Sequence, residues 1–177
     1  EIEEARSLQW AMIPTEPLCG ERFQFASRVR PATTVGGDFL DYFHLSDGTV
    51  GFYVGDVVGK GLPAALYAAL TVGTLRGIRK TGKLPVQVLE LLNRRLRMRH
   101  IPRRFCRLQY GVFDPATRQL RYANAGLPLP MPDFQCLRDE LRTVIAPDVL
   151  RPSPGLKGLR HHPHHLVSAH SIVHPER

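Results

Sequence analysis

Two short acidic motifs, each flanked by glycines, constrain this chain more than any other feature. The first reads GGDFLD at residues 36–41, and the second reads GDVVGKG at residues 55–61. Between them, residues 39–45 and 50–54 are predicted strands, joined by a turn with a strong Asp47-Gly48 signal. Because the two strands of a hairpin lie side by side, Asp38 and Asp56 are expected at neighbouring strand ends. The sequence therefore predicts a pair of carboxylates held close together.

Paired carboxylates of this kind suit a hard divalent cation. Mg²⁺ and Mn²⁺ prefer carboxylate and carbonyl oxygens, which Asp38, Asp56 and the Val57 carbonyl would supply. Two such ions can share and activate a water for in-line attack on phosphorus, so no side-chain nucleophile is needed. This agrees with the absence of a G-x-S-x-G motif from the sequence. The pattern favours a metal-dependent hydrolase with Asp38 and Asp56 as its catalytic and metal-binding residues.

The glycines around the two acids are predicted to shape the loops, because glycine permits positive φ and close backbone approach. These loop-shaping positions are Gly36, Gly37, Gly59 and Gly61. The competing interpretation is that an Asp in a glycine-rich turn only caps its own backbone. A nucleotide-binding P-loop is rejected, because the segment around Lys60 lacks the upstream glycine spacing and the following Ser or Thr.

The remaining periodicity predicts an α+β fold. Helices are expected at 1–13, 62–80 and 85–99, and further strands at 23–29, 109–113 and 120–124. Runs of strands and runs of helices, rather than strict alternation, indicate a layered fold with antiparallel sheets. Three segments follow: a connector helix at 1–14, a domain core at 15–132, and an atypical tail at 133–177.

Composition limits the other possibilities. The 177 residues suffice for one domain with a core, and no apolar run is long enough for a membrane span. Three widely spaced cysteines fit neither a disulfide framework nor a zinc site, so a cytoplasmic location is expected. The net charge is +8, and seven arginines lie within residues 94–107. Since no nucleic-acid-binding signature accompanies them, a solvated helix end or a docking surface for an acidic or phosphorylated protein is favoured.

Several motifs in order resemble the SpoIIE/RsbU branch of the metal-dependent Ser/Thr protein phosphatases, the PPM family. The matching stretches are ARSLQ at 5–9, VGGDFLD at 35–41, GDVVGKGLPAAL at 55–66, LLN at 91–93, YGVFD at 110–114 and YANAG at 122–126. The resemblance covers about residues 5–132. It implies an α-β-β-α sandwich of two antiparallel sheets flanked by helices. It also implies two Mn²⁺ or Mg²⁺ ions, with Asp38, Asp56 and the Val57 carbonyl among their ligands.

The resemblance also implies biological partners. The usual substrate is phosphoserine or phosphothreonine on an anti-anti-sigma protein, whose dephosphorylation releases a sigma factor. Such domains commonly follow a sensor or receiver domain, which fits a connector helix at 1–14. The substrate protein, the upstream signal and the oligomeric state are not specified by the sequence.

The last third of the chain departs from the family pattern. The later Thr-Asp-Gly step and a further Asp, which supply metal ligands in the family, are not found. Residues 133–177 are rich in Pro and His, with a short helix expected only at 136–145. Three explanations stay open: a truncated or frame-shifted domain that is incomplete at its C-terminal end, a natural non-catalytic relative, or unusual ligands such as His161 and His162. The alternative to a phosphatase is accordingly a catalytically weak or inactive module that binds a phosphorylated regulator.

Overall fold

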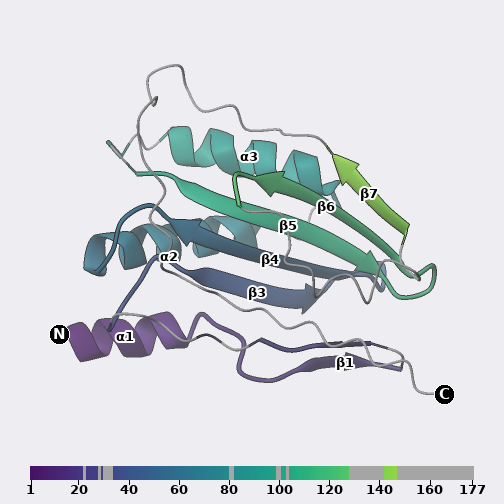
Figure 1. The fold of residues 1–177 in the computed structure, drawn as a ribbon, viewed down its shortest axis with the longest axis horizontal. Coiled ribbons are helices and arrows are strands. Elements are labelled where there is room, and N and C mark those ends of the chain that lie inside the picture. Colours follow the sequence, from purple (N-terminus) through teal and green to yellow (C-terminus); the bar gives the residue numbers. More distant parts are fainter. Residues whose placement is uncertain are drawn as a thin grey trace.

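The computed structural model describes residues 1–21, 23–27, 29, 34–79, 82–98, 101–102, 104–127 and the backbone of 142–146. The chain forms α1 (Ile2–Trp10), β1 (Leu18–Gly20), β2 (Phe23–Phe25), β3 (Phe39–His44), β4 (Val50–Val57), α2 (Leu62–Ile78), α3 (Pro85–Arg97), β5 (Cys106–Asp114), β6 (Gln119–Ala125) and β7 (Arg142–Ala146). Figure 1 shows α2 and α3 along one face of the larger sheet, with α1 and the β1–β2 pair beside its β3 edge. The predicted α+β class with two sheets is confirmed.

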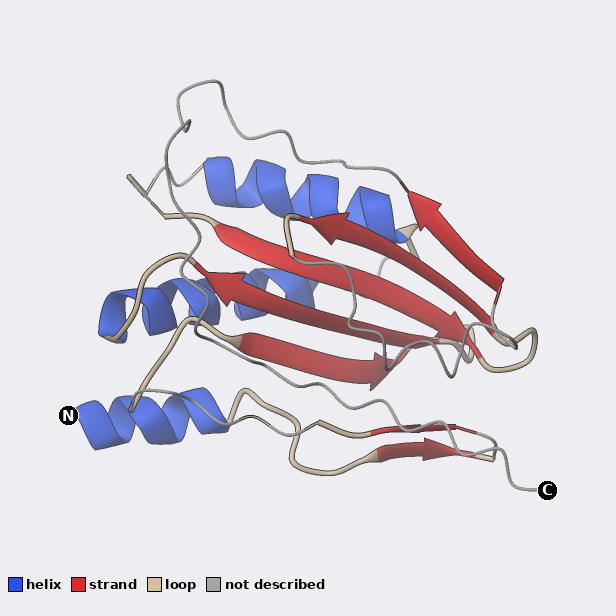
Figure 2. Ribbon diagram, viewed as in Figure 1, coloured by secondary structure: helices blue, strands red, loops and turns tan. Residues whose placement is uncertain are grey.

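The larger sheet has the strand order β3-β4-β5-β6-β7, and β1 and β2 form a separate antiparallel pair (Figure 2). Neighbouring strands from β3 to β6 are antiparallel, whereas β7 lies parallel to β6. The helix expected at 136–145 is therefore wrong for residues 142–145, which are in β7. The run Thr143-Val144-Ile145 is β-branched and so suits a strand better than a helix.

The core lies between the sheet and helices α2 and α3. Alternate residues of each strand point towards the helices, among them Tyr53 of β4 and Tyr110 of β5, both about 1% exposed. The other alternate residues point to the opposite face, where Phe25 of β2 packs on Phe52 and Phe113 with ring centroids 5.5 and 6.0 Å apart. One face of the sheet thus packs on α2 and α3, and the other packs on β2.

β4 is longer than the strand predicted at residues 50–54. β4 runs to Val57 rather than Val54, because β5 continues to pair with it as far as Val57 and Cys106. Asp56 therefore lies inside a strand and not after one, which corrects the sequence prediction. Asp38 comes directly before the first residue of β3.

The N-terminal elements are shorter than predicted. α1 ends at Trp10, and the N–H groups of Met12 and Ile13 donate to carbonyls three residues back, a tightening typical of a helix end before Pro14. The strand expected at 23–29 is limited to Phe23–Phe25, because its partner β1, which was not predicted, has only three residues. None of the described helices contains an apolar segment of the length that a membrane span requires.

Candidate functional site

The two motif acids meet at one end of the larger sheet. β3 and β4 pair in a register that sets Phe39 opposite Gly55. The hydrogen bond from the Val57 N–H to the Gly37 carbonyl continues this pairing, so that Asp38 lies opposite Asp56. Both residues are half-buried. By strand alternation both belong to the face opposite α2 and α3, the face of Tyr42 and Phe52. Side chains opposite each other on one sheet face have Cβ atoms about 5 Å apart, close enough to share a cation.

Gly37 and Val57 bring the two motif backbones together beside this pair. The Val57 N–H donates to the Gly37 carbonyl over 3.1 Å. A Cβ at residue 37 would stand only 2.6 Å from the Val57 carbonyl oxygen, so the close approach requires glycine. The Val57 carbonyl that the sequence analysis singled out thus lies directly against the first motif.

The other three loop-shaping glycines differ in what they do. Gly59 and Gly61 have φ of +114° and +69°, a region that favours glycine, and Gly61 forms the N-cap of α2. Gly36 has open space around its α-carbon. Its backbone is held by Gln9 of α1, whose side-chain nitrogen donates to the Gly36 carbonyl at 2.6 Å and whose oxygen accepts from the Gly36 N–H at 3.1 Å. This contact ties α1 to the loop before Asp38.

Two arginines of the run at residues 94–107 contact the second motif. Arg107 of β5 is the cross-strand neighbour of Asp56, and its Nη2 donates to the Asp56 Oδ2 at 2.5 Å. Arg104 donates from Nη1 to the Val58 carbonyl at 2.9 Å. The described arginines of this run therefore lie in two settings, the second motif and the end of α3. Only Arg94, Arg95 and Arg97 lie in the last turn of α3, as the solvated-helix alternative expects.

The ion pair with Arg107 argues against the interpretation that Asp56 only caps its own backbone. The carboxylate of Asp56 faces a cation rather than its own turn, because Asp56 is paired to Arg107 within the sheet. No sequence signal identified Arg107 as a neighbour, since the pairing depends on the register of β4 with β5.

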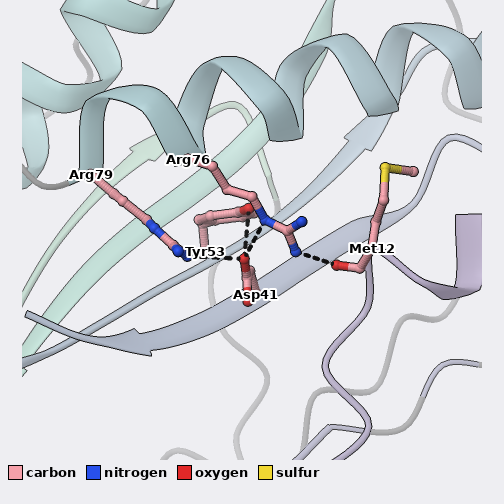
Figure 3. A network of polar contacts seen from close by, with 5 residues as sticks. All are labelled: Met12, Asp41, Tyr53, Arg76 and Arg79. Carbon is pink, nitrogen blue, oxygen red and sulfur yellow. Dashed lines mark hydrogen bonds and ion pairs between the residues drawn. The ribbon is translucent and has the colours of Figure 1, made fainter.

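Asp41, the last acid of the first motif, belongs to a different cluster (Figure 3). It is 7% exposed on the helix-facing side of β3. Its Oδ2 accepts from Tyr53 Oη at 3.2 Å, Arg76 Nε at 3.0 Å and Arg79 Nη1 at 3.3 Å. Arg76 also donates from Nη2 to the Met12 carbonyl at 2.7 Å. Asp41 thus joins β3, β4, α2 and the end of α1, and it is not available to the Asp38–Asp56 pair.

Comparison with known proteins identifies the segment that carries this site. The family model described as Stage II sporulation protein E (SpoIIE) matches residues 46–132. Residues 46–132 thus match the SpoIIE family, to which the sequence analysis found a resemblance. The matched range contains Asp56 and Val57 and begins after Asp38.

Individual relatives agree with this assignment. Phosphoserine phosphatase RsbU of Bacillus subtilis is 29% identical over 71% of this chain and 37% of its own length. Phosphoserine phosphatase RsbP of the same organism is 28% identical over 72% of this chain and 32% of its own length. The solved SiaA-PP2C domain of Pseudomonas aeruginosa aligns with a TM-score of 0.59 and 25% identity, over 70% of this chain and 51% of that chain. The chain therefore spans about a third of the length of these curated relatives.

The two acidic motifs offer a partial ligand set for a divalent cation. Asp38, Asp56 and the Val57 carbonyl would give three oxygens, whereas such ions favour six or more. Within the described ranges, no group of three or more His, Cys, Asp or Glu residues could hold a metal. The set fits one Mg²⁺ or Mn²⁺ ion that keeps several waters, a common arrangement for Mg²⁺. A second ion would need ligands from outside the described residues, where His161 and His162 also lie.

Proposed function

We propose that this chain is the catalytic segment of a metal-dependent phosphoprotein phosphatase that hydrolyses phosphoserine or phosphothreonine. The observation that carries the proposal is the strand register that sets Asp38 opposite Asp56 on one sheet face, with the Val57 carbonyl against Gly37. The two relatives named as phosphoserine phosphatases support the same reaction. A PPM-type fold in a solved PP2C domain supports the same architecture.

In this proposal each residue has a distinct role. Asp38 and Asp56 hold Mn²⁺ or Mg²⁺ through their carboxylate oxygens, and the Val57 carbonyl adds a neutral oxygen. A bound divalent cation would lower the pKa of water and offset charge on the phosphoryl group. Gly37, Gly59 and Gly61 hold the two loops in the conformations that place these oxygens together.

The partners and the setting are extensions of the same proposal. The substrate would be a phosphorylated anti-anti-sigma-type protein in a cytoplasmic partner-switching system that controls a sigma factor. The α1 helix would act as a connector from an upstream sensor or receiver domain. Two observations support a connector: Ile2 and Leu8 are 53% and 71% exposed, and Gln9 binds the loop that leads to Asp38.

A second candidate is a phosphatase-like module that binds a phosphorylated regulator with little or no turnover. The ion pair between Arg107 and Asp56 favours it, because a guanidinium compensates the charge of a proposed metal ligand. The partial ligand set favours it as well. In this case the fold and the partner would be retained while the reaction is lost.

Hydrolysis of a phosphoserine peptide across a Mn²⁺ titration separates the two candidates. The phosphatase proposal expects metal-dependent turnover that falls at least about a hundredfold in Asp38→Asn and Asp56→Asn, as expected for loss of a central electrostatic group. Asp47→Asn is the matched control, because Asp47 lies in the β3–β4 turn and accepts from Thr49. Binding of the peptide without turnover in the unchanged protein would support the binding module instead.

A further inference from the structure

Arg107 lies in a row of residues that crosses the sheet at the proposed metal centre. Asp56 and Arg107 are direct partners in the β4–β5 register, and one step beyond the Leu108–Ala125 pair sets Arg107 opposite Gly126. With Asp38 opposite Asp56, the row reads Asp38, Asp56, Arg107 and Gly126 across four neighbouring chain segments. The positive charge is therefore placed beside the acid by the backbone pairing.

We propose that Arg107 is an internal cation that occupies the Asp56 carboxylate and competes with the divalent metal for it. This inference rests on the proposed function only in assigning Asp56 as a metal ligand. Nη2 of Arg107 donates to Oδ2 of Asp56 in a charge-assisted hydrogen bond, a class roughly twice as strong as bonds between neutral groups. A carboxylate in such a pair has one oxygen engaged and its charge compensated. A divalent ion must displace the guanidinium to use that oxygen.

The surroundings of Arg107 restrict where its guanidinium can go. Its aliphatic stem lies along Gly126, since a Cβ at residue 126 would be 3.5 Å from Arg107 Cγ and 3.9 Å from Cδ. The side chains of Arg107 and Asp56 are 34% and 22% exposed, so solvent screens their attraction only in part. Charge repulsion between the guanidinium and a cation on Asp56 is correspondingly stronger than at a fully exposed pair.

The hydrogen bonds of Arg107 are incomplete, which makes its displacement feasible. Its Nε is buried and has no hydrogen-bond partner within the described part of the chain. Among the described residues, the guanidinium is therefore held by Asp56 through Nη2 while its Nε is unpaired. Arg104, in contrast, donates to the backbone carbonyl of Val58. This bond does not involve the Asp56 carboxylate, so metal binding at Asp56 would not compete with it. Of the two described arginines that contact the second motif, Arg107 is therefore the one that competes for the Asp56 carboxylate.

The test is the affinity for Mn²⁺, measured by isothermal titration calorimetry on the full chain without substrate. Arg107→Gln should bind Mn²⁺ about tenfold more tightly than the unchanged protein, the equivalent of losing one charge-assisted contact. Arg107→Lys keeps the charge and should stay close to the unchanged protein. Arg94→Gln removes the same charge from the exposed end of α3 and should alter the affinity less than twofold.

A second measurement applies if Arg107→Gln does not fold. The ¹⁵Nε–Hε signal of Arg107 in the unchanged protein should shift as Mg²⁺ is titrated in, with the same midpoint as Mg²⁺ binding. Equal Mn²⁺ affinity of the unchanged protein and folded Arg107→Gln would overturn the inference, as would an Arg107 signal that stays constant while Mg²⁺ binds. Tighter Mn²⁺ binding by Arg107→Gln without peptide hydrolysis would retain the inference and reject the phosphatase proposal.

Discussion

Gly37 and Val57 are hydrogen-bonded neighbours across the two acidic motifs, with 3.1 Å between the Val57 nitrogen and the Gly37 carbonyl oxygen. The contact leaves no room for a side chain at residue 37, because a Cβ there would stand 2.6 Å from the Val57 carbonyl oxygen. The geometry of the proposed metal centre therefore requires that residue 37 have no side chain. Gly36, the adjacent residue, has no such neighbour.

Gly37→Ala should accordingly destabilise the protein by about 1–3 kcal/mol, the usual cost of forcing an extra carbon into a packed site. It should also weaken Mn²⁺ binding, because the Val57 carbonyl has to move. Urea unfolding and calorimetric titration measure the two effects. Gly36→Ala is the matched control and should change both much less, and equal effects of the two substitutions would contradict the role given to Gly37.

The Gly59–Gly61 loop gives a second comparison. Alanine at either position must adopt positive φ, at a cost of about 1–2 kcal/mol. At Gly59 a Cβ would also overlap the Arg104 guanidinium and disturb its bond to the Val58 carbonyl, which adds about 1 kcal/mol. Gly59→Ala should therefore lower the free energy of unfolding more than Gly61→Ala. In an Arg104→Ala background the difference between the two should shrink, and a constant difference would count against the Arg104 contact.

The buried carboxylate of Asp41 should contribute to stability without taking part in metal binding. Asp41→Asn leaves Arg76 and Arg79 without their anionic partner, and the expected loss is about 2–3 kcal/mol, below the cost of breaking a fully buried pair because Arg76 is 39% exposed. Glu3→Gln removes the exposed pair of Glu3 with Arg6 and should cost less than about 0.5 kcal/mol. Denaturant unfolding measures both. A loss of Mn²⁺ affinity in folded Asp41→Asn would place Asp41 in the site after all.

The thiols should differ in reactivity. Burial raises the pKa of Cys106 to about 11, whereas Cys19 is exposed. Iodoacetamide at pH 8 should therefore label Cys19 well before Cys106, as peptide mass spectrometry can determine. Equal labelling rates in the folded protein would contradict the raised pKa of the Cys106 thiol.

The same shift has a consequence for stability. Because the folded pKa lies above the unfolded value of 9.0, the neutral thiol stabilises the fold fully below pH 9. This contribution is lost as the pH rises towards about 11. Cys106→Ala should therefore lose less stability over that interval than the unchanged protein, as measured by thermal unfolding at each pH.

The sequence determined the local parts of this protein. The Asp-Gly turn at residues 47–48, the helix starts at Leu62 and Pro85, and the alternation of β5 and β6 depend on neighbouring residues. The sequence pattern therefore predicted them. The pairing of the two acidic motifs was also predictable, because a short hairpin joins them. The family resemblance implied the same site residues, Asp38, Asp56 and Val57, as the sequence pattern did.

Only the tertiary structure decided which charges meet. Asp41 lies three residues from Asp38, yet the two occupy opposite faces of the sheet, because successive strand residues alternate. Arg107 lies far from Asp56 in the sequence and reaches it through the register of β4 with β5. Such long-range pairing is set by the packing of the whole sheet on α2 and α3, and no local pattern encodes it.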